Sequence, residues 1–464
     1  MKTINDPKIL HILQLFSTIH KEAWLVGGCV RDMLMKRELH DYDITTNARP
    51  EEVIALFKNA GYRVIPTGLK HGTVTVLAED EPVEITTYRT ESSYIDHRSP
   101  KAVAYSTDID EDLKRRDFTM NAIAWHPKHG FHDPFHGRAD IEKNMIRCVG
   151  NASDRMQEDA LRILRALRFY CTLHFSLEAS TAQAVRSHAH LLSFISRERI
   201  REEFSRILLQ DYPNTLLLLK DMQVLEEILP DYTKLMTFEQ KNPWHIYDLF
   251  THTDVALNHT AGCTLACKLA VIFHDTGKPQ CESRDKDGVS HYCGHAQKSV
   301  ELAEAWMKQL KYDNKTIRSV LRKINYHDYN LVAKRSVLRR YLSKFDNDVE
   351  EALQAMDVQL ADQLAKNPAL AKDGVNTIQE CRGLLLRMQH EEEQLSLRTL
   401  AVDGRDLLAC GLQGKQIGTA LHMLLDYAMQ DPSRNTSEQL LAEIKRRIKQ
   451  DGSRDSGCPK QEKP

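Results

Sequence analysis

The sequence lacks the hydrophobic and cysteine patterns of membrane and secreted proteins. It contains no run of 18 or more apolar residues, the length that a membrane-spanning helix requires. Its first residues, MKTINDPKIL, lack the apolar core of a signal peptide. Its 10 cysteines include no CxxC pair, which argues against a zinc knuckle or a disulfide framework and favours reduced thiols. We therefore expect a cytoplasmic protein with no membrane partner.

The sequence also lacks an excess of positive charge. Its 63 Lys and Arg residues against 65 Asp and Glu residues give a formal net charge of −2. Any surface that binds nucleic acid must therefore be a local patch. Two clusters of basic residues are candidates for such a patch, and solvated helix faces are the alternative. The clusters are Lys334, Arg335, Arg339, Arg340 and Lys344, and Lys445, Arg446, Arg447 and Lys449.

The pattern of apolar residues predicts an α+β head followed by an all-α remainder. In the first third, the strand-like segments AWLVGG, YDITT, GTVTVLAE and PVEITTYR alternate with the helical patterns VRDMLMK and RPEEVIALFKNAG. From Asp154 onward, apolar residues recur at helical spacing and strand signals nearly vanish. We expect a head with a mixed sheet at 1–147, a helical neck at 148–240, a histidine-rich helical unit at 241–370, a helical tail at 371–450 and a disordered end at 451–464.

The stretch ELHDYDITT places two aspartates, Asp41 and Asp43, one residue apart. Side chains two residues apart on a strand point to the same face, so these carboxylates are expected to project together. Such a pair of hard oxygen ligands suits Mg²⁺, which also relieves their mutual repulsion. Glu84, in the neighbouring strand-like segment PVEITTYR, is the best candidate for a third carboxylate. An ordinary surface loop is the alternative.

A Gly-Gly turn upstream adds a candidate phosphate site. Gly28 opens the expected helix that contains Arg31. Glycine lets the backbone approach a phosphate, the helix N-terminus favours its negative charge, and Arg31 is able to add a charge-assisted contact. A tight strand-to-helix turn without a ligand is the alternative.

These residues resemble a known family. LVGGCVRDMLMKRELHDYDITT is similar to the catalytic motif of class II tRNA nucleotidyltransferases, the CCA-adding enzymes of the polymerase β superfamily. Further stretches resemble the family's motifs in order: YRTESSYIDHRSP its flexible loop, EDLKRRDFTMNAIAW and DPFHGRADI its second and third motifs, EDALRILRALRFY its nucleotide-selecting motif, and ISRERIREEFSRIL the following helix. Six ordered motifs are far more specific than one.

The resemblance implies a Mg²⁺-dependent enzyme that adds CCA to the 3′ end of tRNA from CTP and ATP and releases pyrophosphate. Asp41, Asp43 and Glu84 would be its catalytic residues. The resemblance implies no DNA partner and leaves room for a homodimer. The segment VDGRDLLACGLQGKQIGTALHMLL, at 402–425, is similar to the tail domain of Firmicute-type CCA enzymes, which supports tRNA as the substrate.

Asp159 and Arg162 lie three residues apart and are expected to be neighbours on one helix surface. A carboxylate beside a guanidinium matches the amino donor and ring acceptor that cytosine and adenine share, and rejects uracil and guanine. The resemblance implies this base-reading role for the pair, whereas an ordinary salt bridge is the alternative. It also places Arg165 and Arg168 in the nucleotide pocket, and Arg116 is the expected triphosphate ligand.

The family resemblance leaves the product partly open. The flexible-loop segment, Arg89–Pro100, has the full length, and in this family a shortened loop is associated with enzymes that add only CC. Full CCA addition is therefore favoured. A poly(A) polymerase is the alternative, although its distinctive basic, aromatic stretch after the first motif is absent here. A tRNA nucleotidyltransferase that adds only CC or only A is a second alternative.

A second group of histidines and aspartates resembles the HD phosphohydrolase pattern, which binds divalent metal. We expect an HD domain within 241–370, with a primary metal site and a second metal beside it, and a phosphoester as substrate. Structural histidines are the alternative reading. If this centre were the active one, the head would merely bind RNA. The primary ligands would be His252, His274, Asp275 and Asp362, and the second metal would bind His295 and His327.

Overall fold

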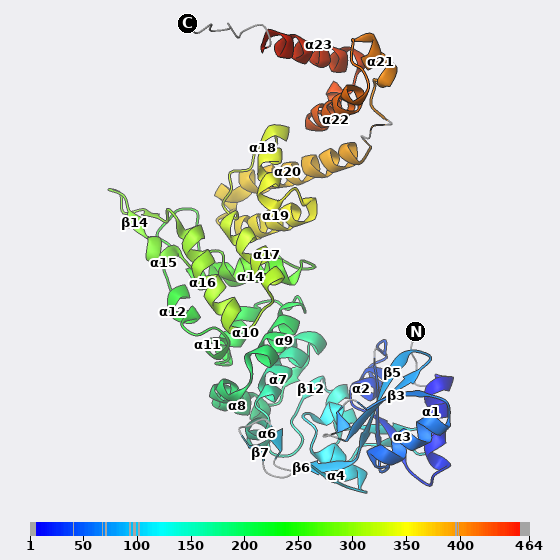
Figure 1. The fold of residues 1–464 in the computed structure, drawn as a ribbon. Helices are drawn as coiled ribbons and strands as arrows, with labels where there is room; N and C mark the ends of the chain where they lie inside the picture. Colours follow the sequence, from blue (N-terminus) through cyan, green and yellow to red (C-terminus); the bar gives the residue numbers. More distant parts are fainter. Residues whose placement is uncertain are drawn as a thin grey trace, which may run out of the picture. The chain divides into compact units, whose positions relative to one another are not determined.

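The computed structural model divides the chain into two compact units, Met1–Asn325 and Tyr326–Pro464. Figure 1 shows the mixed sheet of the first unit and the helices that follow it. Each unit is described by itself below. The structure describes residues 6–39, 41–66, 68–69, 72–91, 94–95, 99–100, 103–394, 397 and 399–454.

The head is built on a seven-stranded sheet with the order β11-β10-β1-β2-β5-β4-β3. β2 and β5 pair in parallel, and the other neighbours are antiparallel, so the sheet is mixed as predicted. The strands predicted from AWLVGG, YDITT, GTVTVLAE and PVEITTYR are confirmed as β1, β2, β4 and β5. The bounds are β1 (Ala23–Val26), β2 (Tyr42–Thr46), β3 (Arg63–Ile65), β4 (Thr73–Ala78), β5 (Glu81–Thr87), β10 (Ala124–His126) and β11 (Gly130–His132).

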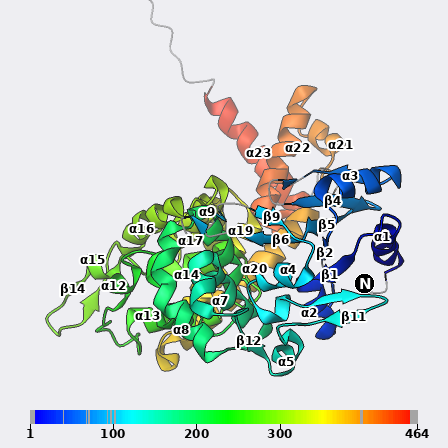
Figure 2. The ribbon, with the colours of Figure 1, turned by 90° about the horizontal axis from the view of Figure 1, so that it is seen from below.

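Helices α1 (Pro7–Ser17), α2 (Gly28–Leu34) and α3 (Pro50–Asn59) accompany the sheet. Pro50 suits the first turn of α3, where its missing N–H costs nothing. The apolar faces of α1 and α3 meet through the rings of Phe16 and Phe57, which pack edge to face with centroids 5.5 Å apart. Figure 2 shows α1 beside β1 and β11.

The predicted flexible loop, Arg89–Pro100, falls partly outside the described residues, because 92–93 and 96–98 are not among them. The described parts form short pairs. They are β6 (Arg89–Glu91) with β9 (Val103–Tyr105) and β7 (Tyr94–Ile95) with β8 (Ser99–Pro100).

The rest of the first unit is helical apart from two short strand pairs, as predicted. Its helices bury apolar residues at helical spacing, and α14 is buried almost throughout. They are α4 (Ile109–Lys114), α5 (Gly137–Glu142), α6 (Ala152–Glu158), α7 (Leu161–Leu173), α8 (Ala179–His188), α9 (Arg197–Leu208), α10 (Thr215–Asp221), α11 (Leu225–Ile228), α12 (Tyr232–Met236), α13 (Leu249–Asn258), α14 (Leu265–Phe273), α15 (Lys278–Cys281), α16 (His295–Gln309) and α17 (Asn314–Asn325).

The second unit contains two separate apolar clusters. One joins α18 (Arg335–Leu342), α19 (Val349–Leu364) and α20 (Pro368–Gln394), and the other joins α21 (Gly404–Ala409), α22 (Lys415–Gln430) and α23 (Ser437–Arg454). The finer domain boundaries expected within the chain stay predictions, and 455–464 of the expected disordered end lie outside the described residues. No helix in the described part of the chain is long and apolar enough to span a membrane.

Candidate active site

The carboxylates of the head gather around Asp43. Asp43 in β2 lies directly opposite Glu84 in β5 in the parallel register, so the two side chains share one face of the sheet. Asp41 immediately precedes β2. Burial raises the pKa of Asp43, Arg116 opposes this, and the charges of Glu84 and Asp41 raise it further. The carboxylates thus repel one another, as expected of hard oxygen ligands whose charge a cation would balance.

Gly27 brings the backbone against this cluster. Its φ of +75° lies in the region that favours glycine, and a Cβ added there would lie 3.1 Å from Arg116 Nη1 and 3.3 Å from Asp43 Oδ2. Arg116 Nη2 also donates to Asp112 Oδ2 at 3.4 Å. Gly27, Asp43 and Arg116 therefore meet at one point, where α2 begins at Gly28.

Arg31 is engaged inside the protein. Its guanidinium donates to both carboxylate oxygens of Asp32 at 2.9 Å and to Asn121 Oδ1 at 2.9 Å, and it lies 5.1 Å from the ring centroid of Phe169. These contacts connect α2 to Asn121 and α7. The predicted contact of Arg31 with a phosphate stays a prediction.

The expected continuous helix through Asp159 and Arg162 is wrong. α6 ends at Glu158, Asp159 has extended backbone angles (φ −135°, ψ 100°), and α7 begins at Leu161. The cause is local, because Asp159 Oδ1 accepts a hydrogen bond from Leu161 N at 3.1 Å and competes with the helical pattern. Asp159 therefore lies at a break between helices, with Arg162 in the first turn of α7.

Arg162 connects α7 to the segment that carries Arg116. Its side chain is 8% exposed, and Nη2 donates to the carbonyl oxygen of Arg115 at 2.9 Å. Nη1 donates to Glu158 Oε2 at 2.9 Å and to the carbonyl oxygen of Arg155 at 3.1 Å. The Arg162 guanidinium thus connects α7 to Arg115, the residue that precedes Arg116.

Arg165 supports the same segment one turn later. Its guanidinium donates to Asp117 Oδ2 at 2.6 and 2.9 Å, and Asn121 Nδ2 donates to Asp117 Oδ1 at 3.1 Å. Arg115 and Asp117 are therefore held from α7, and Arg116 between them lies beside the Gly27 turn, as Asp43 does. We call residues 115–117, with Arg162 and Arg165, the α7 junction.

α9 supports α7 from the opposite side. Arg168 Nε donates to Glu203 Oε2 at 2.7 Å, and its guanidinium lies 4.3 Å from the ring centroid of Phe169. Arg199 Nη2 lies 3.7 Å from Asp159 Oδ2. These contacts orient both ends of the predicted nucleotide-selecting motif.

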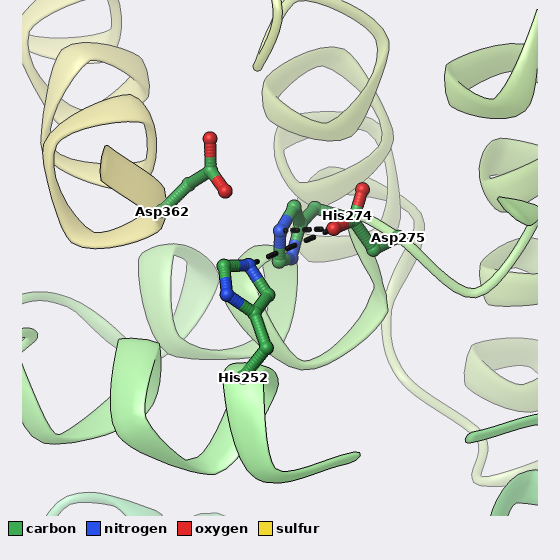
Figure 3. Close-up of side chains that lie close together, drawn as sticks. All are labelled: His252, His274, Asp275 and Asp362. Carbon is green, nitrogen blue, oxygen red and sulfur yellow. Dashed lines mark ion pairs between the residues drawn. The ribbon is translucent and has the colours of Figure 1, made fainter. Parts of the chain in front are cut away.

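A second cluster in the first unit centres on Asp275. His252, His274 and Asp275 are buried, and their ligand atoms lie within 4.8 Å of one another (Figure 3). His274 Nε2 lies 3.1 Å and His252 Nε2 3.7 Å from Asp275 Oδ2, and His295 Nε2 lies 3.3 Å from Asp275 Oδ1. Lys278 Nζ also lies 2.5 Å from Asp275 Oδ2. The structure therefore brings together four of the six predicted HD residues.

Backbone carbonyls orient two of these imidazoles. The Nδ1 atom of His274 lies 2.7 Å from the carbonyl oxygen of Val271, and that of His295 lies 2.8 Å from the carbonyl oxygen of Tyr292. Such hydrogen bonds place the proton on Nδ1 and leave Nε2 facing the carboxylate of Asp275, an arrangement that is also usual for metal-binding histidines.

Asp362 and His327 belong to the second unit. Both are buried there, and Asp362 Oδ2 accepts a hydrogen bond from Lys366 Nζ at 2.5 Å. Their predicted participation in the metal sites stays a prediction.

Two residues of these sites were missed in the sequence. Lys278 carried a signal, because it follows His274-Asp275 at one helical turn. Arg199 carried none, since its approach to Asp159 depends on how α9 packs on α7.

Two known families match parts of this chain. Residues 23–147 match the family described as Poly A polymerase head domain. Residues 174–236 match the family described as probable RNA and SrmB-binding site of polymerase A.

Curated relatives are CCA-adding enzymes. The enzyme of Bacillus cereus (strain Q1) is 49% identical over 205 residues, which are 44% of this chain and 51% of the relative. That of Lactobacillus johnsonii is 49% identical over 211 residues, which are 45% of this chain and 52% of the relative. The matched part of this chain thus spans about half the length of these relatives.

Solved structures with the same fold support this relation. The structure of the Bacillus stearothermophilus CCA-adding enzyme in complex with CTP has a TM-score of 0.62 and 26% identity, and the match covers 98% of this chain and 100% of that chain. The Thermotoga maritima CCA-adding enzyme, complexed with tRNA, has a TM-score of 0.55 at 18% identity, covers 95% of this chain and 96% of that one, and bears on the fold alone. The predicted fold class and the resemblance to CCA-adding enzymes are confirmed, and the expected HD domain stays a prediction.

Proposed function

We propose, from the premise that this chain is related to the CCA-adding enzymes and carries a Poly A polymerase head domain, that it adds CCA to the 3′ end of tRNA. The tRNA 3′-oxygen attacks the α-phosphorus of CTP or ATP. A new O–P bond forms, the bond to the β-phosphate oxygen breaks, and pyrophosphate leaves. The observation that carries the proposal is the α7 junction, in which Arg162 and Arg165 of α7 hold Arg115 and Asp117 while Arg116 lies with Asp43 at the Gly27 turn.

Different residues of the head bind the triphosphate and the metal. The Gly27-Gly28 turn and the N-terminus of α2 lie against the triphosphate, and Arg116 donates to it. Asp41 and Asp43, with Glu84 beside them, would hold Mg²⁺, because Asp43 lies opposite Glu84 in the parallel pair of β2 and β5 and these hard oxygen donors repel one another without a cation. When bound, the metal supplies charge compensation and Lewis-acid assistance.

Base selection is assigned to Asp159 and Arg162. The Asp159 carboxylate accepts from the exocyclic amino group of cytosine or adenine, and the Arg162 guanidinium donates to the ring acceptor beside it. At the helix break, the Asp159 side chain is 22% exposed. Arg199 Nη2 lies 3.7 Å from Asp159 Oδ2 and helps to orient the carboxylate. Uracil and guanine present the opposite donor order and are rejected.

The proposal is tested with purified full-length protein, a tRNA transcript that ends at the discriminator base, and each nucleoside triphosphate singly. We expect CTP to be incorporated into this transcript and ATP into a transcript that already ends in CC, whereas UTP and GTP are not incorporated. Incorporation of UTP or GTP at a rate comparable to CTP would rule out the Asp159/Arg162 assignment.

Product length separates the alternative enzymes. A product that stops after CC indicates a CC-adding enzyme, one that requires a CC end indicates an A-adding enzyme, and a long adenosine tail indicates a poly(A) polymerase. Sequencing the products made with all four nucleotides resolves these cases.

A second activity is favoured by the cluster around Asp275. We propose that His252, His274 and Asp275 hold a divalent metal, that His295 serves a second metal beside it, and that the substrate is a phosphoester; the part expected of Asp362 and His327 stays a prediction. The anchored Nδ1 atoms of His274 and His295 carry this proposal. Metal analysis of the purified protein tests it, because His274→Ala should lower the bound metal and leave nucleotide addition intact. Unchanged metal content in that variant would refute the site.

A further inference from the structure

A pocket of about 520 Å³ lies at the end of β1 away from the carboxylate cluster. β1 runs from this pocket, at Ala23 and Trp24, to Val26, which precedes the Gly27 turn. The pocket is therefore separate from the proposed nucleotide-adding site. Its volume is within the usual range for small-molecule sites.

The pocket is walled by aromatic rings around Trp24. The ring centroids of His126, His129 and His132 lie 5.3, 5.7 and 6.0 Å from that of Trp24. His126 and His129 are stacked on each other with centroids 4.7 Å apart. Phe131 also lines the pocket. These rings come from β1, β10, β11 and the turn between the last two strands, and they offer flat faces to a flat ligand.

Hydrogen bonding keeps two of these imidazoles from acting as free cations. Lys128 N donates to His126 Nδ1 at 3.1 Å, so the proton of the neutral ring lies on Nε2. Burial, and then the positive charges of His129 and Lys128, lower the pKa of His126. His132 Nε2 lies 2.5 Å from Asp110 Oδ1. His126 therefore carries one N–H donor, on Nε2, while its ring packs against His129 and Trp24.

The rim of the pocket carries positive charge. Lys128 is exposed, and its ammonium group makes no ion pair within the described part of the chain. The Arg138 guanidinium lies 4.9 Å from the ring centroid of Phe131. Lys21 lies on the lining too but pairs with Glu52 at 3.1 Å, and Glu22 is an exposed acid of the lining. The lysine of the lining that is available to a ligand is thus Lys128, beside the aromatic walls, and Arg138 lies behind Phe131 outside the lining.

We propose that this pocket binds a nucleoside phosphate, with the base against Trp24 and His129 and the phosphate at Lys128. Aromatic faces accept any base, and a nearby cation accepts the phosphate that accompanies it. A free nucleotide and a nucleotide within an RNA strand share this chemistry. The proposal does not depend on nucleotide addition by the head.

The test titrates the full-length protein with AMP and follows tryptophan fluorescence. We expect saturable quenching that disappears in Trp24→Phe, which retains an aromatic ring in the core contact. Lys128→Ala should weaken AMP binding on the order of tenfold, as expected when one charge-assisted contact of about 1.4 kcal/mol is lost. Adenosine and ribose 5-phosphate should each bind more weakly than AMP. Lys143→Ala, an exposed lysine on α5's C-terminal side, is the matched control and should bind like wild type.

Two further experiments distinguish this pocket from the proposed nucleotide-adding site, and a free nucleotide from a nucleotide within an RNA strand. Arg116→Ala should leave the quenching by AMP unchanged, because Arg116 lies at the other site. A short oligoadenylate that binds more tightly than AMP identifies an RNA strand as the source, and equal or weaker binding identifies the free nucleotide. Absent or non-saturable quenching, quenching retained in Trp24→Phe, an unchanged affinity in Lys128→Ala, or loss of binding in Arg116→Ala would each overturn the proposal.

Discussion

The buried carboxylate of Asp117 connects the end of α4 to α7. Burial alone would raise the pKa of Asp117, but the guanidinium of Arg165 and the amide of Asn121 outweigh burial and hold the pKa well below its usual range. Because the pKa is lower in the folded protein than in the unfolded chain, this carboxylate stabilises the fold above the ordinary carboxyl pKa of about 4. That stabilisation diminishes as the pH falls below this value.

Asp117→Asn should therefore lower the free energy of unfolding by about 2–3 kcal/mol at pH 7. This is less than the 3–5 kcal/mol of a fully buried pair, because the Arg165 side chain is 34% exposed. Urea unfolding at pH 7 and pH 3 measures the effect, and the gap between wild type and variant should narrow at pH 3. A gap of equal size at both pH values would contradict the assignment of the ion pair.

The contacts that each charged side chain makes were the feature of the site least predictable from the sequence. Strand periodicity predicted Asp41 and Asp43 on one face, whereas β2 begins at Tyr42 and leaves Asp41 just before the strand. Glu84 was expected on a neighbouring strand without a known register. The contacts of Arg31, Arg162 and Arg165 depend on tertiary packing, and no local pattern indicates them. Sequence reasoning therefore identified the charged side chains and left open whether each would bind a ligand or another residue.

The turn between β1 and α2 requires glycine at position 27, both for its backbone angles and for the space that the turn leaves. Gly27 has φ +75° and sits against Arg116 and Asp43, whereas Gly150 has φ +71° and no atom within 4 Å of an added Cβ. Both substitutions to alanine strain the backbone, at a cost of about 1–3 kcal/mol. Only the first also displaces site residues.

Gly27→Ala should consequently reduce CTP incorporation at least tenfold more than Gly150→Ala, while the two variants lose similar stability. Thermal unfolding and single-nucleotide incorporation, measured on the same preparations, provide the comparison. Equal losses of activity would show that backbone strain, and not the contact with Arg116 and Asp43, accounts for the effect.

The helices and strands were more predictable from the sequence than the contacts between side chains. β1, β2, β4, β5 and α3 were expected from alternation, turn residues and Pro50, and each is confirmed. The break at Asp159 was not expected, because the apolar spacing of EDALRILRALRFY continues across it. A side-chain hydrogen bond to the backbone overrides that spacing, and the break removes Asp159 from the regular helix surface.

At the scale of the molecule, the head and the Asp275 cluster are two candidate centres in one compact unit. Three arginines of the predicted basic clusters are engaged locally in the second unit, since Arg446 and Arg447 contact Glu443 at 2.7 and 2.6 Å, and Arg339 Nε donates to the Gln430 carbonyl oxygen at 3.1 Å. The net charge of −2 fits a protein that recognises RNA through local surfaces.

The most direct measurement compares nucleotide addition to tRNA by full-length Asp43→Ala and His274→Ala. The account predicts that Asp43→Ala abolishes incorporation of CTP and ATP, because the carboxylate cluster is the reaction centre, and that His274→Ala incorporates both at the wild-type rate. Glu51→Gln, an exposed carboxylate on α3, is the control for Asp43→Ala. Loss of incorporation in His274→Ala with retention in Asp43→Ala would place the reaction at the Asp275 cluster and contradict the account.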